Sequence, residues 1–261
     1  MQNFVFKSGW QRDKVDSRDY LYTPNIMSTG KGVKAPTPVN LQQQCAPVID
    51  QGSLGSCTSC ATIAVADFVR RKQRYNIWTP SVLFTYYATR LLENTVNQDR
   101  GAYIRDALKS VKMYGIAPDL YWRYDVSKFA VRPPAAVWTE ALKYQSIRYL
   151  RINHLQIDNL IQCLKDGYPF VFGVDVYGSF ISQTTAATGI VTTPVPGKDN
   201  LIGGHAMTCV GFEYVGGKLR FIVRNSWGTR WGMAGYCRMD ADYLTSATMA
   251  ADFWTIRTME A

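Results

Sequence analysis

Apolar residues recur at helical spacing in the first half of the chain and form short strand-like runs in the second half. Between Ser56 and about Arg71 they fall on one helix face, and Ser56 is a good N-cap residue. Pro and Gly signals at the ends of other periodic segments predict further helices at 81–92, 103–114, 133–144 and 154–166. Strands are predicted at 170–177, 205–214, 219–225 and 235–239. Helices followed by strands indicate α+β architecture, with a helical lobe beside a sheet lobe.

The N-terminal stretch differs from the rest of the chain. Residues 1–44 are polar, rich in turn residues and weakly periodic, and 27–38 has the glycines and prolines of a linker. We therefore expect an N-terminal extension over 1–44 and a folded domain over 45–261. Within that domain, the helical lobe is expected at about 51–130 and the β lobe at about 131–245.

Composition and charge exclude some classes of protein. Hydrophobic residues make up 47% of the 261 residues and charged residues 19%, as in ordinary soluble domains. No apolar run approaches the roughly 20 residues that span a bilayer, and the N-terminus lacks the apolar core of a secretory signal. We expect no membrane partner, and a location in the cytoplasm or inside a viral or cellular assembly. The net charge is +9, but the basic residues are scattered, which argues against a nucleic-acid partner. The densest cluster, 70–74, lies where a helix should end and its dipole favours cations.

The six cysteines do not form a recognisable metal or disulfide array. Cys57 and Cys60 have CxxC spacing, but no second pair follows and the chain has only two histidines, so we expect no metal and no cofactor. A disulfide scaffold is also unusual in a chain of this length. Most of the thiols are therefore interpreted as buried and reduced.

Three residues carry candidate chemistry. Cys57 begins a predicted helix, whose N-terminus favours a thiolate, and the loop before it offers backbone N–H groups and the Gln51 amide to a developing oxyanion. His205 follows two glycines at the start of a strand, where another chain can approach closely. Asn225 could accept the imidazole N–H and orient the ring, and Trp227 could shield that bond from water. Cys, His and Asn together form a known variant of the nucleophile triad.

The sequence around these residues resembles the papain-like cysteine peptidases. Residues 51–57 (QGSLGSC), 204–206 (GHA) and 225–236 (NSWGTRWGMAGY) match the three signature blocks of that family in order and spacing. Pro169, 101–103 and 114–116 look like further landmarks, and the resemblance covers about 45–245. It implies a papain-like two-lobe fold, with a helical left lobe, an antiparallel sheet in the right lobe and the active-site cleft between them.

The resemblance also implies roles for residues of this chain. Cys57 would be the nucleophile, His205 its ion-pair partner and general acid, and Asn225 the residue that orients His205. Gln51 and the backbone N–H of Cys57 would form the oxyanion hole. The expected reaction is hydrolysis of a polypeptide through a thioester acyl-enzyme. The predicted substrate-binding residues are Gly101 and Ala102, which would pair with the substrate backbone, together with Gly55 and Trp227.

The chain departs from the family pattern at several positions. Leu54 stands where secreted members usually have a cysteine, so their disulfide is absent here. Thr58 replaces an aromatic residue, Ala102 replaces a glycine and would narrow the neighbouring subsites, and Gly204 replaces a polar residue. The pattern resembles bacterial, phage and giant-virus members, and the long helical pro-segment of lysosomal enzymes is missing.

Two alternatives to peptide hydrolysis stay open. The same acyl-enzyme could pass its acyl group to an amine, as in a ligase, or the chain could be a non-catalytic peptide-binding or structural relative in a larger assembly. Oligomeric state and substrate preference are also left open.

Residues 1–44 interleave aromatic and charged residues, which suggests a segment that docks on the domain. Either it inhibits the enzyme from within the cleft or it braces the outside of a lobe. The bracing interpretation is favoured, since ordered termini more often serve packing.

Overall fold

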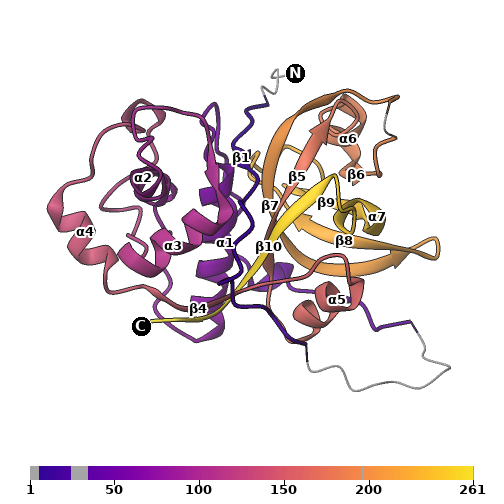
Figure 1. Cartoon of the computed structure of the whole chain (residues 1–261), viewed down its shortest axis with the longest axis horizontal. Helices are drawn as coiled ribbons and strands as arrows, with labels where there is room; N and C mark the ends of the chain where they lie inside the picture. Colours follow the sequence, from indigo (N-terminus) through magenta and orange to yellow (C-terminus); the bar gives the residue numbers. More distant parts are fainter. Residues whose placement is uncertain (1–5, 25–34, 196, 261) are drawn as a thin grey trace.

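The computed structural model describes residues 6–24, 35–195 and 197–260 and consists of two lobes packed side by side (Figure 1). One lobe is helical and the other is built on a β-sheet, in agreement with the predicted α+β fold. The helical lobe contains α1 (Cys57–Lys72), α2 (Val82–Leu92), α3 (Ile104–Tyr114), α4 (Ala135–Ala141) and the short 3-10 helix η2 (Val126–Lys128).

The second lobe is an eight-stranded, mostly antiparallel sheet. Its main path runs through β4 (Ser146–Arg151), β10 (Ala250–Met259), β5 (Phe170–Tyr177), β7 (Leu201–Val215), β8 (Lys218–Arg224), β9 (Tyr236–Asp240) and β6 (Ile190–Val191). A further strand, β2 (Val39–Asn40), pairs with β7. The remaining helices are η1 (Gln42–Gln44), α5 (Ile157–Lys165), α6 (Gln183–Thr188) and α7 (Ala241–Leu244). A separate two-stranded sheet joins β1 (Trp10–Gln11) to β3 (Ala102–Tyr103).

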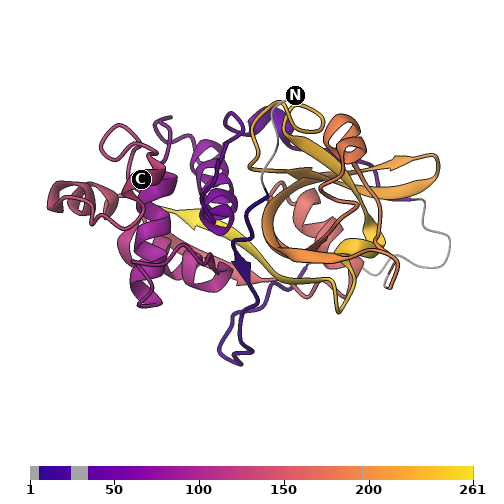
Figure 2. The same cartoon turned by 90° about the horizontal axis from the view of Figure 1, so that it is seen from above.

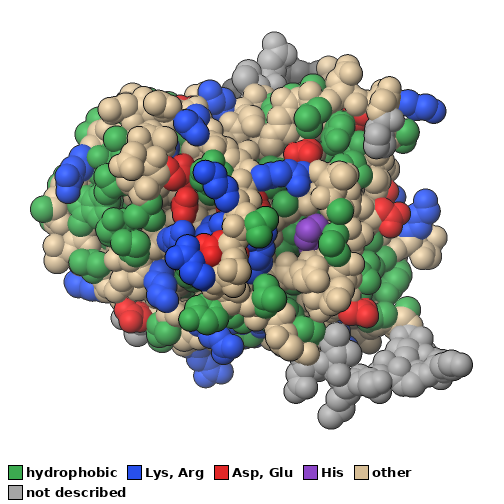
Figure 3. Space-filling view, viewed as in Figure 1, with side chains coloured by type: hydrophobic (Ala, Val, Ile, Leu, Met, Phe, Trp, Pro, Cys, Tyr) green, Lys and Arg blue, Asp and Glu red, His purple; other side chains and the backbone are tan. Residues whose placement is uncertain are grey.

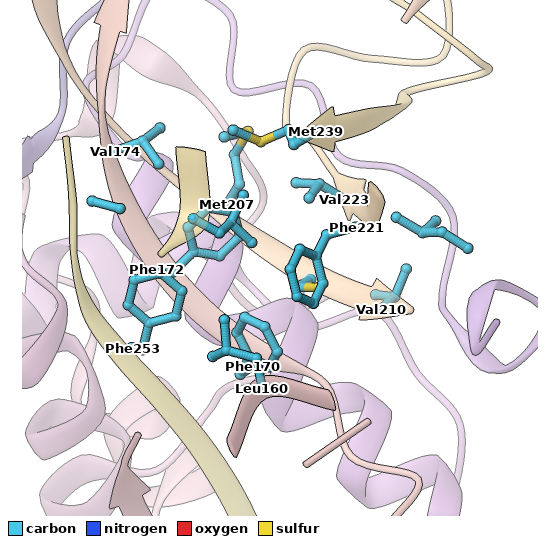
Figure 4. Packing of buried hydrophobic residues seen from close by; sticks show 14 of the residues in the cluster. Leu160, Phe170, Phe172, Val174, Met207, Val210, Phe221, Val223, Met239 and Phe253 are labelled. Atoms are coloured by element: carbon cyan, nitrogen blue, oxygen red, sulfur yellow. The ribbon is translucent and has the colours of Figure 1, made fainter. Parts of the chain in front are cut away.

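Aromatic side chains fill the core of the β lobe. Phe170 and Phe172 project from β5 and Phe253 from β10, and the ring centroids of Phe172 and Phe253 lie 5.2 Å apart (Figure 4). Phe221 of β8 and Leu160 of α5 close the same cluster, and all five side chains are fully buried. Burial of this much apolar surface is the main force that holds the sheet in its curved form.

Helix α1 lies between the lobes and packs against both. Its apolar face contacts β7 and β10 on one side, and α2 and α3 on the other. The basic cluster at its end has a structural role. The Arg70 guanidinium is buried, donates to the Asn76 carbonyl over 2.7 Å and lies 3.7 Å from the centre of the Trp78 ring. Because α1 is fixed by both lobes, its first residue is held rigidly at their junction.

The predicted elements agree with the structure where periodicity is strong. The strand over 170–177 has the predicted bounds, and the helix over 103–114 begins only one residue later than predicted. The helix predicted at 133–144 is shorter, at Ala135–Ala141. Strands β4 and β10 were not predicted.

The predicted β lobe of 131–245 needs two corrections. Helix α4 belongs to the helical lobe, because Val137 and Ala141 share a buried cluster with Phe84 of α2. Strand β10, which lies beyond 245, is an inner strand of the sheet between β4 and β5. The boundary at 44 is also too late, since β2 already pairs with β7. Residues 27–34 of the predicted linker lie outside the described residues.

None of the six cysteines forms a disulfide; five are buried and Cys45 is partly exposed. Among the helices of the described residues, none has the length and apolar character needed to cross a membrane.

Candidate active site

Cys57 is the first residue of α1 and lies where the two lobes meet. Its side chain is fully buried, and its sulfur accepts the backbone N–H of Ala206 from β7 over 3.4 Å. The residue before it, Ser56, was predicted to cap the helix, but its side chain accepts no hydrogen bond from the first turn. Its hydroxyl instead bonds the hydroxyl of Tyr124, 2.7 Å away, and Tyr124 donates to the backbone carbonyl of Gln51 over 2.8 Å. The loop before the helix is thus tied to the body of the helical lobe.

His205 lies on β7 and meets Asn225, the residue directly after the neighbouring strand β8. Nε2 of His205 lies 2.7 Å from Oδ1 of Asn225, and both side chains are buried. The same Oδ1 accepts the backbone N–H of Ser226 over 2.8 Å, so the amide oxygen faces the ring and Nε2 carries the proton. The other ring nitrogen, Nδ1, is buried and has no hydrogen-bond partner within the described ranges. Trp227 stacks on the imidazole with ring centroids 4.6 Å apart.

Gln51 links the cysteine loop to the asparagine loop. Its Oε1 accepts the Ser226 hydroxyl over 2.6 Å, and its Nε2 donates to the Leu54 carbonyl over 2.9 Å. The backbone N–H of Gln51 also bonds the Ser226 carbonyl over 2.9 Å. The side chain is buried and fixed at both ends. Its amide is therefore fixed in one orientation in the loop that leads to Cys57, as a pre-organised donor requires.

The N-terminal segment passes between the lobes directly over Cys57. Figures 1 and 2 both show this segment, in indigo, running between α1 and the sheet. Gly9 approaches so closely that a Cβ atom there would lie 2.9 Å from the Cys57 sulfur and 2.3 Å from the Gly55 carbonyl oxygen. Phe6 packs edge-on against His205, with ring centroids 6.0 Å apart. The favoured interpretation, a brace on the outside of one lobe, is wrong for this part of the segment.

The predicted substrate-pairing strand is paired with this segment. Ala102 donates its backbone N–H to the Gly9 carbonyl over 2.9 Å, and β1 runs parallel to β3 with Trp10 opposite Ala102. Gly101 has a φ of +81°, and a Cβ atom there would lie 2.2 Å from the Gly9 oxygen. Glycine is required at this position both by the backbone conformation and by the close approach of the segment.

Residues 12–22 extend the docking with charged contacts. Asp19 accepts from Arg105 over 2.6 Å and from Arg151 over 2.8 Å. Tyr22 is buried and its backbone bonds the edge of β4, while Tyr20 is exposed. Figure 3 shows Lys and Arg side chains gathered near the middle of this face. The ion pairs of Asp19 with Arg105 and Arg151 hold this part of the segment against the domain.

Burial controls the charge states of Cys57 and His205. It raises the pKa of the Cys57 thiol to about 12, against the lowering effect of the Ala206 N–H and of the backbone N–H groups at the start of α1. Burial also lowers the pKa of His205 to about 4, although the bond to Asn225 acts in the opposite direction. With the segment in place the two groups are therefore neutral. The expected thiolate is not the favoured form of this closed arrangement.

Some residues that organise the site were missed in the sequence. Asp99 accepts the Gly55 N–H over 2.9 Å and the Tyr86 hydroxyl over 2.7 Å, and that hydroxyl accepts the Gly101 N–H over 3.3 Å. One carboxylate thus positions two of the predicted substrate-binding glycines. Its position two residues before Gly101 is the local signal that could have indicated Asp99. Asp252, which bonds Trp10 of the segment, has no such signal.

The comparisons with known proteins agree with this geometry. The sequence model of the papain family cysteine proteases matches residues 35–254. A peptidase C1-like protein of Acanthamoeba polyphaga mimivirus is 40% identical over 95% of this chain and 86% of its own length. Ananain of Ananas comosus is 26% identical, and the match covers 76% of this chain and 53% of ananain.

Among solved structures, xylellain, a cysteine protease from Xylella fastidiosa, superposes with a TM-score of 0.83. It is 35% identical, and the match covers 98% of this chain and 99% of xylellain. The lobes, the three sequence blocks and these matches agree. The chain is a cysteine peptidase and belongs to the papain family.

Proposed function

We propose that this peptidase cleaves peptide bonds with Cys57 as the nucleophile, His205 as acid and base, and Asn225 as the orienting group. The observation that carries this assignment is the 2.7 Å contact between His205 Nε2 and Asn225 Oδ1. This contact occupies Nε2 and leaves Nδ1 of His205 as the free base. The next residue, Ala206, donates its backbone N–H to the Cys57 sulfur, which places His205 close to the thiol along the chain. Transfer of the thiol proton to Nδ1 would give the reactive thiolate and an imidazolium.

The remaining steps follow from the same groups. The thiolate attacks the substrate carbonyl, and the negative charge moves to the carbonyl oxygen. The backbone N–H of Cys57 and the second N–H of the Gln51 amide are the donors for that oxygen. The C–N bond then breaks as the imidazolium protonates the leaving amine, and a thioester on Cys57 remains. A water molecule, deprotonated by His205, releases the acid product and restores the thiol.

Labelling of the thiols tests this assignment. In the Gly9→Val variant, which is designed to displace the segment, we expect iodoacetamide at pH 6 to label Cys57 at least about tenfold faster than the other cysteines, since ordinary thiols with a pKa near 8.5 are protonated there. Peptide mapping by mass spectrometry reads the site of each adduct. Uniform slow labelling, or preference for Cys60, would contradict the assignment. If an amine nucleophile is added and becomes part of the product, the ligase alternative is favoured. If Cys57 is labelled but no peptide is turned over, the non-catalytic alternative is favoured.

We further infer that residues 6–13 inhibit the enzyme from within. The segment occupies the backbone edge at Ala102, covers the Cys57 sulfur and contacts His205, so a substrate cannot reach these groups while it is docked. Its removal would also return water to Cys57 and His205, and the burial that keeps both groups neutral would end. Withdrawal of the segment would therefore uncover and activate the site in one step.

Docking of the segment is expected to weaken as pH rises. Burial, with the neighbouring Asp252 carboxylate, raises the pKa of Asp13 from its ordinary 3.8 to about 7. Arg105 and the Trp254 indole face Asp13 and oppose this, while Arg151 and Arg12 lie on the side of Asp252. Because docking raises the pKa of Asp13, the segment docks better when this carboxyl is protonated. The docked state is therefore most stable in acid and loses stability as pH rises through about 7.

The measurement compares alkylation of Cys57 in the native chain and in Asp13→Asn, in which the titrating group is removed. The ratio of the two alkylation rates cancels the pH dependence of the Cys57 thiol itself. We expect the ratio of native to variant rates to rise by roughly a hundredfold from pH 5 to pH 8, because the docked pKa of about 7 lies two units above pH 5 and each unit corresponds to about 1.4 kcal/mol. A ratio that stays flat or falls would contradict control by Asp13.

A further inference from the structure

Cys60 is a second thiol in the first turn of the helix that carries Cys57. The two residues are the first and the fourth of α1, and both side chains are buried in the same cluster. The other cysteines belong to the core cluster of the β lobe or pack against it: Cys45, Cys163, Cys209 and Cys237. Cys60 is therefore the thiol that shares both a helix turn and a buried cluster with Cys57.

The Cys60 thiol points toward the end of α1 at which Cys57 lies. Its sulfur is 3.9 Å from the hydroxyl oxygen of Ser56, the residue directly before Cys57. Side chains on a helix lean toward its N-terminus, so this direction is the ordinary one. Burial raises the pKa of the Cys60 thiol, and a negative charge on Cys57 raises it further. This electrostatic effect agrees with two sulfur atoms that lie close together.

The spacing of the two residues suits a disulfide bond. In an α-helix, Cα atoms three residues apart are separated by about 5 Å, within the range of about 4.4–6.8 Å found across disulfides. The Cβ atoms of such a pair are about 5–6 Å apart and must approach each other by about 1–2 Å. Thiol oxidoreductases form disulfides between cysteines with this Cys-X-X-Cys spacing.

The start of α1 has the freedom for this approach. The N–H of Cys60 donates to the Ser56 carbonyl over 3.0 Å, whereas the N–H groups of residues 57–59 precede the helical hydrogen-bond ladder. A cavity of about 10 Å³ adjoins Cys60 on the side of Ala206. Withdrawal of the segment also removes Gly9, which now lies against the Cys57 sulfur. The two sulfur atoms can therefore meet in the opened enzyme.

We propose that Cys57 and Cys60 of the opened enzyme form a disulfide bond when a peroxide oxidises Cys57, and that Cys60 thereby keeps the loss of activity reversible. This rests on the proposed function, because it takes Cys57 as the thiolate that His205 generates. Cys60 is then a redox modification site, and its co-reactant is hydrogen peroxide or an organic hydroperoxide.

The chemistry takes two steps. The Cys57 thiolate attacks one oxygen of the peroxide and the O–O bond breaks. Cys57 becomes a sulfenic acid, and the leaving oxygen takes the proton held by His205 and departs as water or an alcohol. The Cys60 sulfur then attacks the Cys57 sulfur, and the sulfenic hydroxyl leaves with the Cys60 proton as water. Two equivalents of an added thiol reduce the disulfide and restore both cysteines.

The test uses the opened Gly9→Val chain, with and without Cys60→Ala. Each chain is treated with excess hydrogen peroxide, and peptide hydrolysis is measured before and after reduction with dithiothreitol. Peroxide should remove the activity of both chains. Dithiothreitol should then restore most of the untreated rate in the Gly9→Val chain and at least about tenfold less in Cys60→Ala, in which further peroxide oxidises the sulfenic acid irreversibly to sulfinic acid.

Cys209→Ala in the same background is the matched control. It also removes a buried thiol, but one that lies on β7 in the core of the β lobe. This variant should recover as the Gly9→Val chain does. Equal recovery in Cys60→Ala and Cys209→Ala would overturn the role of Cys60. If Cys60→Ala fails to fold, Cys60→Ser, which is closer to cysteine in shape and also lacks the thiol, takes its place.

Peptide mapping without reduction detects the bond itself and does not depend on turnover. A chymotryptic peptide that begins at Gly55 and ends at Phe68 carries Cys57 and Cys60 as its two cysteines. Peroxide should lower its mass by that of two hydrogen atoms, and dithiothreitol should restore it. Sulfinic acid on Cys57 beside a free Cys60 thiol would overturn the proposal. If the disulfide forms but no peptide is ever cleaved, the redox site stands and the proposed function is refuted.

Discussion

Replacing Gly9 with valine is expected to raise the rate of peptide hydrolysis by the full-length chain about ten- to a hundredfold. A Cβ atom at this position would lie 2.3 Å from the carbonyl oxygen of Gly55, which is backbone and cannot move aside easily. Overlap of this kind costs about 1–3 kcal/mol, and each 1.4 kcal/mol changes an equilibrium tenfold. The substitution therefore weakens docking of the segment without altering any group that we assign to the chemistry. Steady-state hydrolysis of a fluorogenic peptide measures the effect.

Val15→Ala is the matched control for this variant. Val15 belongs to the same segment but is 98% exposed, so its replacement should change neither the docking nor the rate. The melting temperature of each variant is measured in parallel. If Gly9→Val lowers the melting temperature and leaves the rate unchanged, the segment stabilises the fold without restraining the enzyme. The self-inhibition inferred here would then be wrong.

In the opened Gly9→Val chain, His205→Ala should lower kcat by roughly 10⁴-fold or more, and Asn225→Ala by only about ten- to a hundredfold. Loss of His205 removes both the acceptor of the thiol proton and the donor to the leaving amine. Removal of a triad residue with both roles lowers kcat more than removal of the orienting residue. Loss of Asn225 removes one hydrogen bond to the ring, worth about 1.5–3 kcal/mol when the ring is charged. Trp227 would still cover the imidazole from one side.

The same substitution at Asn159 separates catalysis from stability. Asn159 is also buried, but it lies on α5 and its side chain bonds the Asn153 carbonyl, away from Cys57. Asn159→Ala should therefore affect the melting temperature and leave kcat unchanged. Equal losses in His205→Ala and Asn225→Ala would show that Asn225 does more than orient the ring. Full activity of Asn225→Ala would remove it from the triad.

Much of the fold could be predicted because its elements have local signals. The helix that carries Cys57, the helix over 103–114 and the strand over 170–177 show clear periodicity or end signals, and the structure confirms them. Strand β10 lacks such a signal. It is an inner strand with both faces covered, so its residues do not alternate between apolar and polar. For the same reason the lobe boundary at 245 was placed too early.

The sequence by itself determined the family of this protein and the side chains available for chemistry, because each signature block is a short run of neighbouring residues. Only the tertiary structure decided where the N-terminal segment lies and what it does to the site. Trp10 and Asp252 are separated by 242 positions, and their bond leaves no trace in the pattern near either residue. The charge state of Cys57 was decided in the same way. Its place at a helix N-terminus favours a thiolate, but the burial to which the docked segment contributes outweighs that effect and keeps the thiol protonated.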